Sequence, residues 1–488
     1  MKQQIVDYLK ACYPALYLVS HEERRVERIL AQAAKEAGRR VFHWSVTEGR
    51  IDVQSKKIEA IHEPVAILET LGSLPPKSLL LLKDYHLFLA PDHSYHASIV
   101  RRLKDAIRDA KERDLCLVIL AARTALPPEL SKIFVTVDVP LPDRAELADL
   151  LKAICQNNGF HPPTGALLNS IVDSARGLSE DEATDAFSLS LVQHNDIAAE
   201  TIAREKARTI ARNGILEIVT DTIPPEQIGG LANLKQDLLS KRNLFTQEAW
   251  EFGLTPPRGM LVVGQPGTGK SLTAKALKTI FGIPLLRLEA GRLFGTFIGE
   301  SEGNWRTAFA TAKASAPCIL WIDEAEGLFN SGDRDGGTTQ RVIKAILQDM
   351  QEDSTGIFYC FTANDIDRIP DPIIDRLETW SVDLPDDEER RAIWKIQIAK
   401  IRGAKGWNPE ALTPETMEAI VERSMGFSGR QIERAWEKAL EIAFNEHRGP
   451  TDKDIYAACE GMIPTSITMA EAIRERQERL KNRCRPAS

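Results

Sequence analysis

The segment around Lys270 has the residue types and the spacing to bind the phosphates of a nucleotide. The apolar run Met260–Val263 leads into Gly264-Gln-Pro-Gly-Thr-Gly-Lys-Ser271, which matches the pattern G-x-x-x-x-G-K-[ST] and precedes a helical stretch. Glycines let such a loop turn its N–H groups toward a phosphate, and the positive end of the next helix adds to that field. Lys270 would reach the β- and γ-phosphates, and Ser271 would give its hydroxyl to Mg²⁺. The predicted nucleotide-binding residues are Gly264, Gln265, Pro266, Gly267, Thr268, Gly269, Lys270, Ser271 and Leu272.

Two further polar clusters follow apolar runs and could complete a hydrolytic site. Cys318–Ile322 is followed by Asp323, which could hold the Mg²⁺ shell through water, and by Glu324, which could polarise the attacking water. Asn364 follows the run Gly356–Phe361, and an amide there can hydrogen-bond both the γ-phosphate and the lytic water. In isolation these would be solvated acids and a turn residue. Downstream of a phosphate loop they predict Mg²⁺-dependent hydrolysis.

Short apolar runs alternate with amphipathic stretches along most of the chain, which predicts parallel α/β layers. The expected strands are Ala15–Val19, Leu79–Leu82, Leu115–Leu120, Met260–Val263, Leu285–Leu288, Cys318–Ile322 and Gly356–Phe361. The expected helices include Glu22–Ala37, Ser98–Glu112, Ser271–Phe281 and Thr339–Met350. Two segments, 143–212 and 386–460, are helical without strands, and each follows one α/β block.

The order of these segments indicates an internal duplication. Val139-Pro-Leu-Pro-Asp143 precedes a helix and then Gly177-Leu-Ser179, and Val382-Asp-Leu-Pro-Asp386 precedes a helix and then Gly426-Phe-Ser428. Upstream of both lies an apolar strand that ends in aspartate. Two unrelated α/β domains could each contain such turns, because the turn sequences are common. The shared order of the features along the chain favours duplication instead.

The chain has 488 residues, which suggests several domains. A hinge is expected near Thr220–Pro225, where paired prolines stop a helix. The expected parts are a degenerate α/β domain (1–142), a helical domain (143–219), a nucleotide-binding α/β domain (220–385), a helical lid (386–465) and a basic C-terminal segment (466–488). Within the last, Ala470–Arg485 is predicted to be helical, either solvated or binding a partner or nucleic acid.

The composition of the chain argues against several classes of protein. The net charge of −8 and the pI of about 5.8 argue against a bulk nucleic-acid binder. The seven scattered cysteines form no C-x-x-C pair, which indicates reduced thiols without a metal site. The N-terminal segment lacks the pattern of a signal peptide, and no run approaches the roughly 20 apolar residues of a membrane span. A soluble, cytoplasmic protein is therefore expected.

Together these motifs resemble those of the AAA family of oligomeric ATPases over about residues 222–460. The resemblance adds Ile228-Gly-Gly-Leu231, whose Ile228 and Gly229 would lie near the adenine, and makes Asn364 the first sensor residue. It implies a P-loop NTPase parallel sheet with a helical lid, preceded by a degenerate AAA-like α/β plus helical domain.

A narrower resemblance is to an AAA family encoded in algal chloroplast genomes and cyanobacteria. It rests on the unusual N-terminal half, on Arg212-Asn-Gly-Ile-Leu-Glu217 and on Pro284-Leu-Leu-Arg-Leu288. If the chain comes from an algal plastid, this resemblance implies the chloroplast stroma as its location.

Three further sites follow from the AAA resemblance. Phe297 and Ile298, before Gly299, are similar to the pore loop that grips a threaded polypeptide, although Phe297 could instead fold into the core. Arg430 falls where many members of the wider superfamily carry a second sensor that contacts the γ-phosphate; a solvated arginine on a helix surface is the alternative.

The third site is the arginine finger, for which AAA members carry two arginines after the first sensor. Here the sequence reads Asp371-Pro-Ile-Ile-Asp-Arg-Leu377, so Asp375 takes the first place and Arg376 remains. A neighbour's arginine completes related sites. Hydrolysis could therefore be slow, use Arg376 alone, or draw on Arg334 or Arg368.

The first half of the chain departs from the pattern of an active domain. After its first strand it reads Ser20-His-Glu-Glu-Arg-Arg25, and its acidic strand ends Leu82-Lys-Asp84-Tyr85, with Tyr85 where a catalytic glutamate would stand. An acidic turn without glycine cannot cradle phosphate. This half is expected to serve assembly, partner recognition or closure of the site.

The leading hypothesis is an ATPase that converts ATP and water to ADP and phosphate, with ATP and Mg²⁺ as its ligands. The AAA resemblance implies a homo-oligomeric, hexameric ring that remodels a protein client, which the sequence does not identify. One alternative is an ATP-dependent switch or scaffold that hardly hydrolyses, motivated by the reduced arginine finger. Another is a nucleic-acid remodeler or loader, motivated by the basic segment and disfavoured by the overall acidity.

Overall fold

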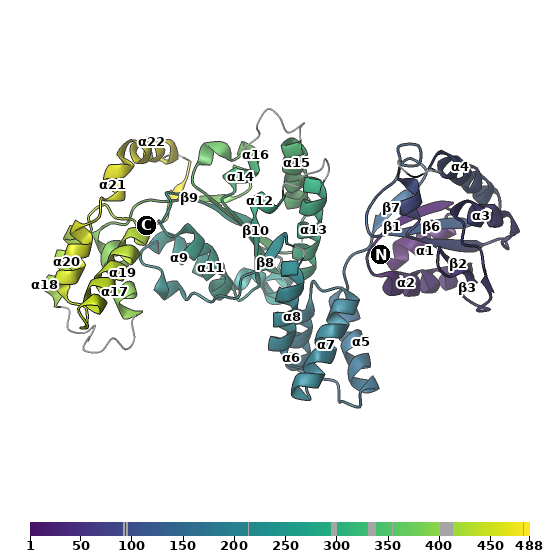
Figure 1. The fold of residues 1–488 in the computed structure, drawn as a ribbon, viewed down its shortest axis with the longest axis horizontal. Helices are drawn as coiled ribbons and strands as arrows, with labels where there is room; N and C mark the ends of the chain where they lie inside the picture. The colour runs from purple at the N-terminus through teal and green to yellow at the C-terminus, as the bar shows by residue number, and fades with distance from the viewer. Residues whose placement is uncertain are drawn as a thin grey trace. The chain divides into compact units, whose positions relative to one another are not determined.

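The computed structural model describes residues 1–90, 93, 96–212, 214–293, 300–329, 338–353, 355–400, 413–481 and 483–488. Within these ranges the chain forms two compact units. The first comprises Met1–Pro162 and Leu178–Ser188, and the second Pro163–Gly177 and Leu189–Ser488. Each unit contains one sheet with helices on both faces (Figure 1).

The described strands of the first unit lie in the order β4-β3-β2-β5-β6-β1-β7. They are β1 (Ala15–Val19), β2 (Arg40–Ser45), β3 (Gly49–Asp52), β4 (Ile58–Glu59), β5 (Ser78–Lys83), β6 (Cys116–Ala121) and β7 (Val135–Asp138). Helices α1 (Lys2–Lys10) and α2 (Glu23–Glu36) cover one face, and α3 (Pro64–Glu69) and α4 (His96–Glu112) cover the other. The central strands β5 and β6 are buried on both faces, which explains their unbroken apolar sequences.

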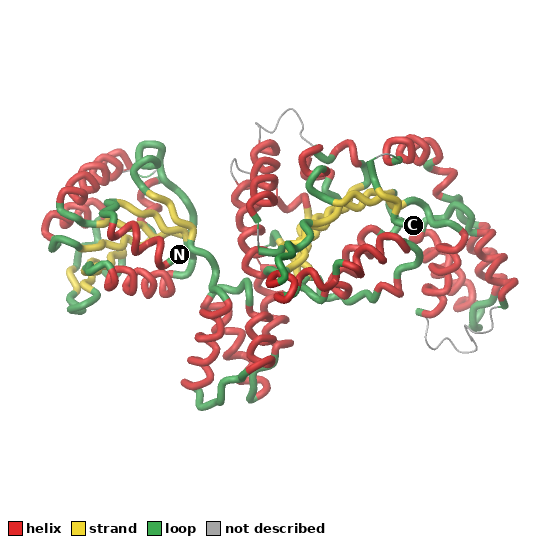
Figure 2. Tube along the Cα trace, turned by 180° about the vertical axis from the view of Figure 1, so that it is seen from behind, coloured by secondary structure: helices red, strands yellow, loops and turns green. Residues whose placement is uncertain are grey.

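The described strands of the second unit lie in the order β14-β13-β9-β12-β11-β10-β8. Figure 2 draws the strands in yellow between the helices in red. They are β8 (Leu216–Ile218), β9 (Gly259–Gly264), β10 (Leu285–Glu289), β11 (Cys318–Asp323), β12 (Ile357–Ala363), β13 (Glu378–Val382) and β14 (Arg485–Pro486). Strand β8 pairs antiparallel with β10, and the other pairs are parallel. Helices α9 (Ala232–Ser240) and α11 (Lys270–Phe281) cover one face. The other face packs against α13 (Glu300–Ser315), α14 (Glu326–Phe329) and α15 (Thr338–Glu352).

Helices that follow β13 form a lid with a core of its own. Its members are α17 (Asp387–Ala399), α18 (Pro414–Arg423), α19 (Gly429–Asn445) and α20 (Asp452–Glu460). Trp394, Phe427 and Trp436 pack together among them. The remaining helices are α5 (Arg144–Asn157), α6 (Gly165–Ala175), α7 (Glu180–His194), α8 (Ala199–Arg212), α10 (Gln247–Glu251), α12 (Ala290–Leu293), α16 (Asp371–Ile374), α21 (Thr465–Thr468) and α22 (Ala470–Leu480).

The two units repeat the same plan, which supports the predicted duplication. Their five central parallel strands run β2-β5-β6-β1-β7 and β10-β11-β12-β9-β13, so the first strand of each block lies between its fourth and fifth. The helix after each block begins with a capping box, at Asp143 in one unit and Asp386 in the other. Gly177 and Gly426 both have positive φ, +90° and +75°. The expected fold, an AAA-like sheet preceding a second sheet with a helical lid, is confirmed.

The C-terminal helix is shorter than predicted, and the segment expected to be a hinge lies inside one unit. The helix predicted over Ala470–Arg485 ends at Leu480, because Arg485 and Pro486 pair with β13. The segment Thr220–Pro225 lies within one unit, where Lys278 Nζ donates to Val219 O and Thr220 O. Among the helices of the described ranges, none has the length and apolar character needed to cross a membrane.

Candidate nucleotide-binding site

The loop between β9 and α11 has a backbone that only certain residues allow. Gly267 and Gly269 have φ of +84° and +101°, a region that side chains with a Cβ rarely adopt. A Cβ on Gly264 would lie 2.3 Å from a backbone oxygen of β13. The glycines of the motif are thus required by the fold of the loop, and the predicted strand–loop–helix context is present.

Lys270 begins α11 and joins the loop to the end of β12. Its side chain is 9% exposed, and Nζ donates to Gly264 O and Gln265 O, both at 2.8 Å, and to Asn364 Oδ1 at 2.9 Å. Asn364 in turn donates from Nδ2 and from its backbone N to Glu326 Oε1, at 2.7 and 3.1 Å. These bonds form one chain from the phosphate loop to the predicted first sensor.

We expect ATP affinity to fall as the pH rises through about 8. Burial lowers the pKa of Lys270 to about 8; the charge of Glu326 raises it and that of Arg476 lowers it further. Bound phosphate favours the protonated ammonium, so above this pKa binding must first take up a proton, which weakens affinity by up to about tenfold per pH unit. Titrations with ATP at pH 7, 8 and 9 measure this. Lys270→Arg, whose side chain stays protonated, should lose the dependence; a flat wild-type affinity would contradict the expectation.

The predicted acids lie at the end of β11. Asp323 Oδ1 accepts from Thr362 Oγ1 at 2.7 Å, and Oδ2 accepts from Arg287 Nη2 at 3.0 Å. Glu324 is exposed, and its backbone has the left-handed conformation, with φ of +49°. Its backbone N donates to Thr362 Oγ1 at 3.3 Å. Because β9, β11 and β12 are parallel, their carboxyl ends bring the lysine, the two acids and the asparagine to one edge of the sheet.

Thr362, Arg287 and Glu326 were missing from the sequence prediction. Thr362 and Arg287 are polar residues within otherwise apolar strands, β12 and β10, and Arg287 also lies over the ring of Trp321 at 5.0 Å. Glu326 is the third acid of the run that starts at Asp323. A polar residue that interrupts a buried strand was the available signal.

The predicted adenine side of the site meets the lid. Ile228 is 6% exposed, and a Cβ on Gly229 would lie 2.4 Å from the Ile393 side chain of α17. At the start of α19, the backbone N of Arg430 donates to Gly267 O at 3.1 Å, while its side chain is exposed. The lid therefore touches both the Ile228–Gly229 element and the phosphate loop.

The remaining loop residues of the prediction differ in exposure. Gln265 is buried, and its Oε1 has no hydrogen-bond partner in the described part of the chain. Thr268 Oγ1 donates to Gln265 O at 2.9 Å. Pro266 is exposed, as are Ser271 and Leu272 in the first turn of α11. The Ser271 hydroxyl is thus accessible to a ligand beside the loop.

The candidate finger arginines bond to their own chain. Arg376 donates to Pro372 O at 2.5 Å and to Gln351 Oε1 at 3.3 Å. Arg368 lies 3.4 Å from a carboxylate oxygen of Asp365. Arg334 and the pore-loop residues Phe297, Ile298 and Gly299 lie outside the described residues.

In the first unit the charges at the corresponding positions are exchanged. Strand β5 ends at Lys83 where β11 ends at Asp323, and α2 begins with Glu23 where α11 begins with Lys270. Lys83 Nζ lies 2.5 Å from Glu27 Oε1 and 3.7 Å from Glu23 Oε2. An ammonium where the other unit has its predicted Mg²⁺ ligand, and a carboxylate where it has its predicted phosphate-binding lysine, disfavour binding of both Mg²⁺ and triphosphate.

The residue that corresponds to Glu324, the predicted catalytic glutamate, is Asp84 rather than Tyr85. Asp84 follows its strand with φ of +51°, as Glu324 does with +49°. Tyr85 is buried, and its hydroxyl donates to Pro64 O at 2.6 Å. The expectation for Tyr85 was wrong by one residue, because the sequence did not fix where β5 ends.

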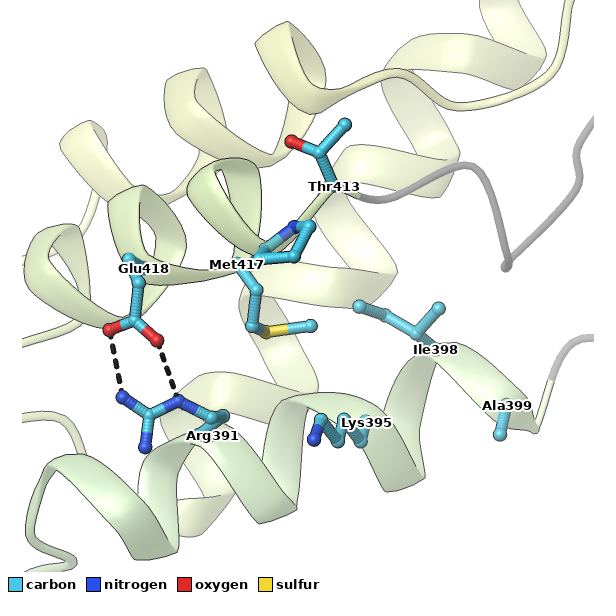
Figure 3. A pocket seen from close by; sticks show the side chains of 8 residues that line it. Arg391, Lys395, Ile398, Ala399, Thr413, Met417 and Glu418 are labelled. Carbon is cyan, nitrogen blue, oxygen red and sulfur yellow. Dashed lines mark hydrogen bonds and ion pairs between the residues drawn. The ribbon is translucent and has the colours of Figure 1, made fainter.

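A cavity of about 340 Å³ lies elsewhere, between α17 and α18 of the lid (Figure 3). Arg391 makes two hydrogen bonds across it to Glu418, at 2.9 and 2.7 Å. Ile398 and Met417 add apolar surface. None of the predicted nucleotide-binding residues lines this cavity, so it is separate from the phosphate site.

Comparison with known proteins agrees with this arrangement. Residues 1–139 and 145–213 match the N-terminal and second domains of the SpoVK-like AAA ATPases, and residues 260–381 match the ATPase family associated with various cellular activities (AAA). The chain is 34% identical to the uncharacterized AAA domain-containing protein ycf46 of Guillardia theta, over 96% of this chain and 93% of the relative. It is 33% identical to the ycf46 protein of Trieres chinensis (94% and 93% covered) and 31% to that of Pyropia yezoensis (96% and 95%). With this phosphate loop, duplicated sheet and helical lid, the chain belongs to the AAA ATPase family, within the group of ycf46 AAA domain-containing proteins.

Proposed function

We propose that the chain binds ATP with Mg²⁺ at the loop between β9 and α11 and hydrolyses it. The observation that carries this proposal is the hydrogen-bonded chain from Lys270 through Asn364 to Glu326, beside Asp323 and Glu324. The residues fit both ligands, because the loop needs its glycines, Ser271 is exposed and Gln265 keeps an unpaired buried acceptor. No cluster of three or more metal-binding residues occurs in the described ranges. A Mg²⁺ held by one hydroxyl, one carboxylate and the phosphates does not require such a cluster.

The proposed roles follow from position. The backbone from Gly264 to Gly269 and the Lys270 ammonium bind the phosphates, while Ser271 and Asp323 would hold Mg²⁺. When bound, this ion would supply positive charge that offsets the charge of the phosphate oxygens. Glu324 accepts a proton from the attacking water, and Asn364 orients that water against the γ-phosphate.

The finer proposal is a homo-oligomeric ring, hexameric as in the family resemblance, that remodels a protein client. Arg376 would act on the neighbouring subunit's nucleotide, Arg430 would serve as a second sensor, and Phe297-Ile298-Gly299 would grip the client. The place of action would be the cytoplasm, or the stroma for a plastid chain.

A site completed between subunits predicts that ATP turnover per subunit rises with protein concentration. Arg376→Ala should lower turnover by about 1,000-fold, since an arginine supplied in trans is worth 10³–10⁵ in related phosphoryl transfers. Mixing Arg376→Ala with Lys270→Ala should restore part of the activity, because each variant supplies what the other lacks. Arg368→Ala, in the neighbouring turn, tests the alternative finger: if Arg376 acts in trans, this variant should keep nearly full turnover, and a large loss would assign the role to Arg368. Turnover independent of concentration, with no rescue on mixing, would contradict assembly.

One observation favours a switch or scaffold as the second candidate. Arg376 already bonds to Pro372 and Gln351, and Asp375 stands where the other arginine would be. Slow turnover with tight ATP binding would support this reading. Two of the arginines that motivated the nucleic-acid alternative, Arg479 and Arg483, pair with Asp367 of the same domain, which counts against this alternative.

A further inference from the structure

Helix α22 is fixed against the ATPase domain beside the first sensor. Arg479 Nη1 and Arg483 Nη1 each bond to one oxygen of Asp367, at 2.9 and 2.8 Å. Asp367 lies in the turn that follows Asn364 at the end of β12. Leu480 is 4% exposed and belongs to the core formed by the sheet and α13 to α15. The helical segment, for which the sequence left a solvated or a partner-binding role open, therefore packs on the nucleotide-binding domain.

The residues after α22 strengthen this attachment. Strand β14 extends the sheet beside β13. Ala487 N donates to Ser381 O at 3.0 Å, and Leu234 N donates to Ala487 O at 3.1 Å. Ala487 is 1% exposed. Anchors on both sides of Leu480 thus hold the orientation of α22.

Arg476 lies one turn before Arg479, on the side of α22 that faces the domain. Its Nη1 is buried and has no hydrogen-bond partner among the described residues. Arg479 and Arg483 bond to Asp367, three residues after Asn364, and Lys270 donates to that Asn364. Helix α22 therefore places Arg476 at the edge of the sheet where the phosphate loop lies. A cation with an unsatisfied buried donor at this edge favours binding of an anion.

We propose that Arg476 binds the γ-phosphate of ATP from within the same chain, so that the docked helix α22 contacts the nucleotide in the ATP state and loses this contact in the ADP state. This inference rests on the proposed function, since it requires ATP at the Gly264–Ser271 loop. A guanidinium offers two parallel N–H groups that match phosphate oxygens. ADP lacks the γ-phosphate, so hydrolysis removes the partner of Arg476. The Arg479 and Arg483 pairs with Asp367 do not involve the nucleotide and hold α22 in both states.

The test compares the affinity of the full-length chain for Mg²⁺–AMP-PNP, which keeps a γ-phosphate, with its affinity for Mg²⁺–ADP. Arg476→Met should weaken the affinity for AMP-PNP about tenfold or more, as expected for loss of a hydrogen bond between charged groups. The affinity for ADP should change less than twofold. Arg474→Met is the matched control, because Arg474 is exposed on the same helix and should change neither affinity. Arg476→Lys, which keeps the charge without the fork, should give an intermediate loss.

Different results separate this inference from the proposed function. If Arg476→Met leaves the ratio of the two affinities unchanged while Lys270→Ala weakens both nucleotides, the inference is overturned and the proposed function stands. Equal losses of affinity for AMP-PNP and ADP in Arg476→Met would also overturn the inference, if the melting temperature falls as it should for Arg479→Met, which breaks an anchor of α22. Arg476 would then have only a structural role. A wild-type chain that binds neither nucleotide would remove both proposals. If Arg476→Met does not fold, the ratio measured with Arg476→Lys decides.

Discussion

Replacing Lys270 by alanine should reduce ATP turnover to the background of the assay and weaken ATP binding by at least about 100-fold. The side chain is the buried cation of the phosphate loop and contacts Asn364 as well as the loop carbonyls. Its removal takes away the charge that faces the β- and γ-phosphates. It also leaves the Asn364 amide without the donor that links it to the loop. Phosphate release and a titration with a fluorescent ATP analogue measure the two effects.

Lys275→Ala is the matched control for this prediction. Lys275 lies on the same helix and pairs with Asp221 at 2.8 Å on the surface. Its loss should leave turnover within about twofold, because exposed ion pairs contribute little. Undiminished hydrolysis by a folded Lys270→Ala protein would show that the activity belongs to another site.

The second large effect is expected from Glu324→Gln, which should keep ATP binding and lower turnover by about 10²–10⁴-fold. Glutamine preserves the size and the hydrogen-bonding capacity of the side chain but cannot accept a proton from water. Glu324 is exposed, so the substitution leaves no charged partner unsatisfied in the core. ATP should remain bound for many turnover times of the wild-type protein, which retention on a desalting column measures.

Two other substitutions of glutamate test whether the effect is specific to Glu324. Glu302→Gln, on the surface of α13 where Glu302 pairs with Arg306, should leave both binding and turnover unchanged. Glu326→Gln should instead disturb Asn364, because Glu326 Oε1 accepts two hydrogen bonds from that residue. Turnover that survives in Glu324→Gln would assign the general base to a different group.

The parts predicted from sequence are those whose signal is local. The run Met260–Val263 and the loop to Ser271 appeared as β9, loop and α11, because buried parallel strands are continuously apolar and the loop needs its glycines. The strands β2, β3, β4, β7, β8, β13 and β14 were missed, and four of them, β4, β7, β8 and β14, lie at the edges of the sheets. All seven contain partly or fully exposed residues and lack a continuous apolar run, so their pairing depends on the neighbouring strands more than on their own pattern.

The sequence by itself predicted the phosphate loop, the acids Asp323 and Glu324, a sensor at Asn364 and the repeat of the α/β block. Each of these lies within a strand or at its end, where residue type and spacing carry the information. Only the tertiary structure decided which residues complete the site. Glu326 and Arg287 reach it from α14 and β10, and the docking of α22 brings the proposed γ-phosphate ligand Arg476 to the same domain. Strand order, register and the docking of α22 set these contacts, and they join residues far apart in the chain, so no local pattern encodes them.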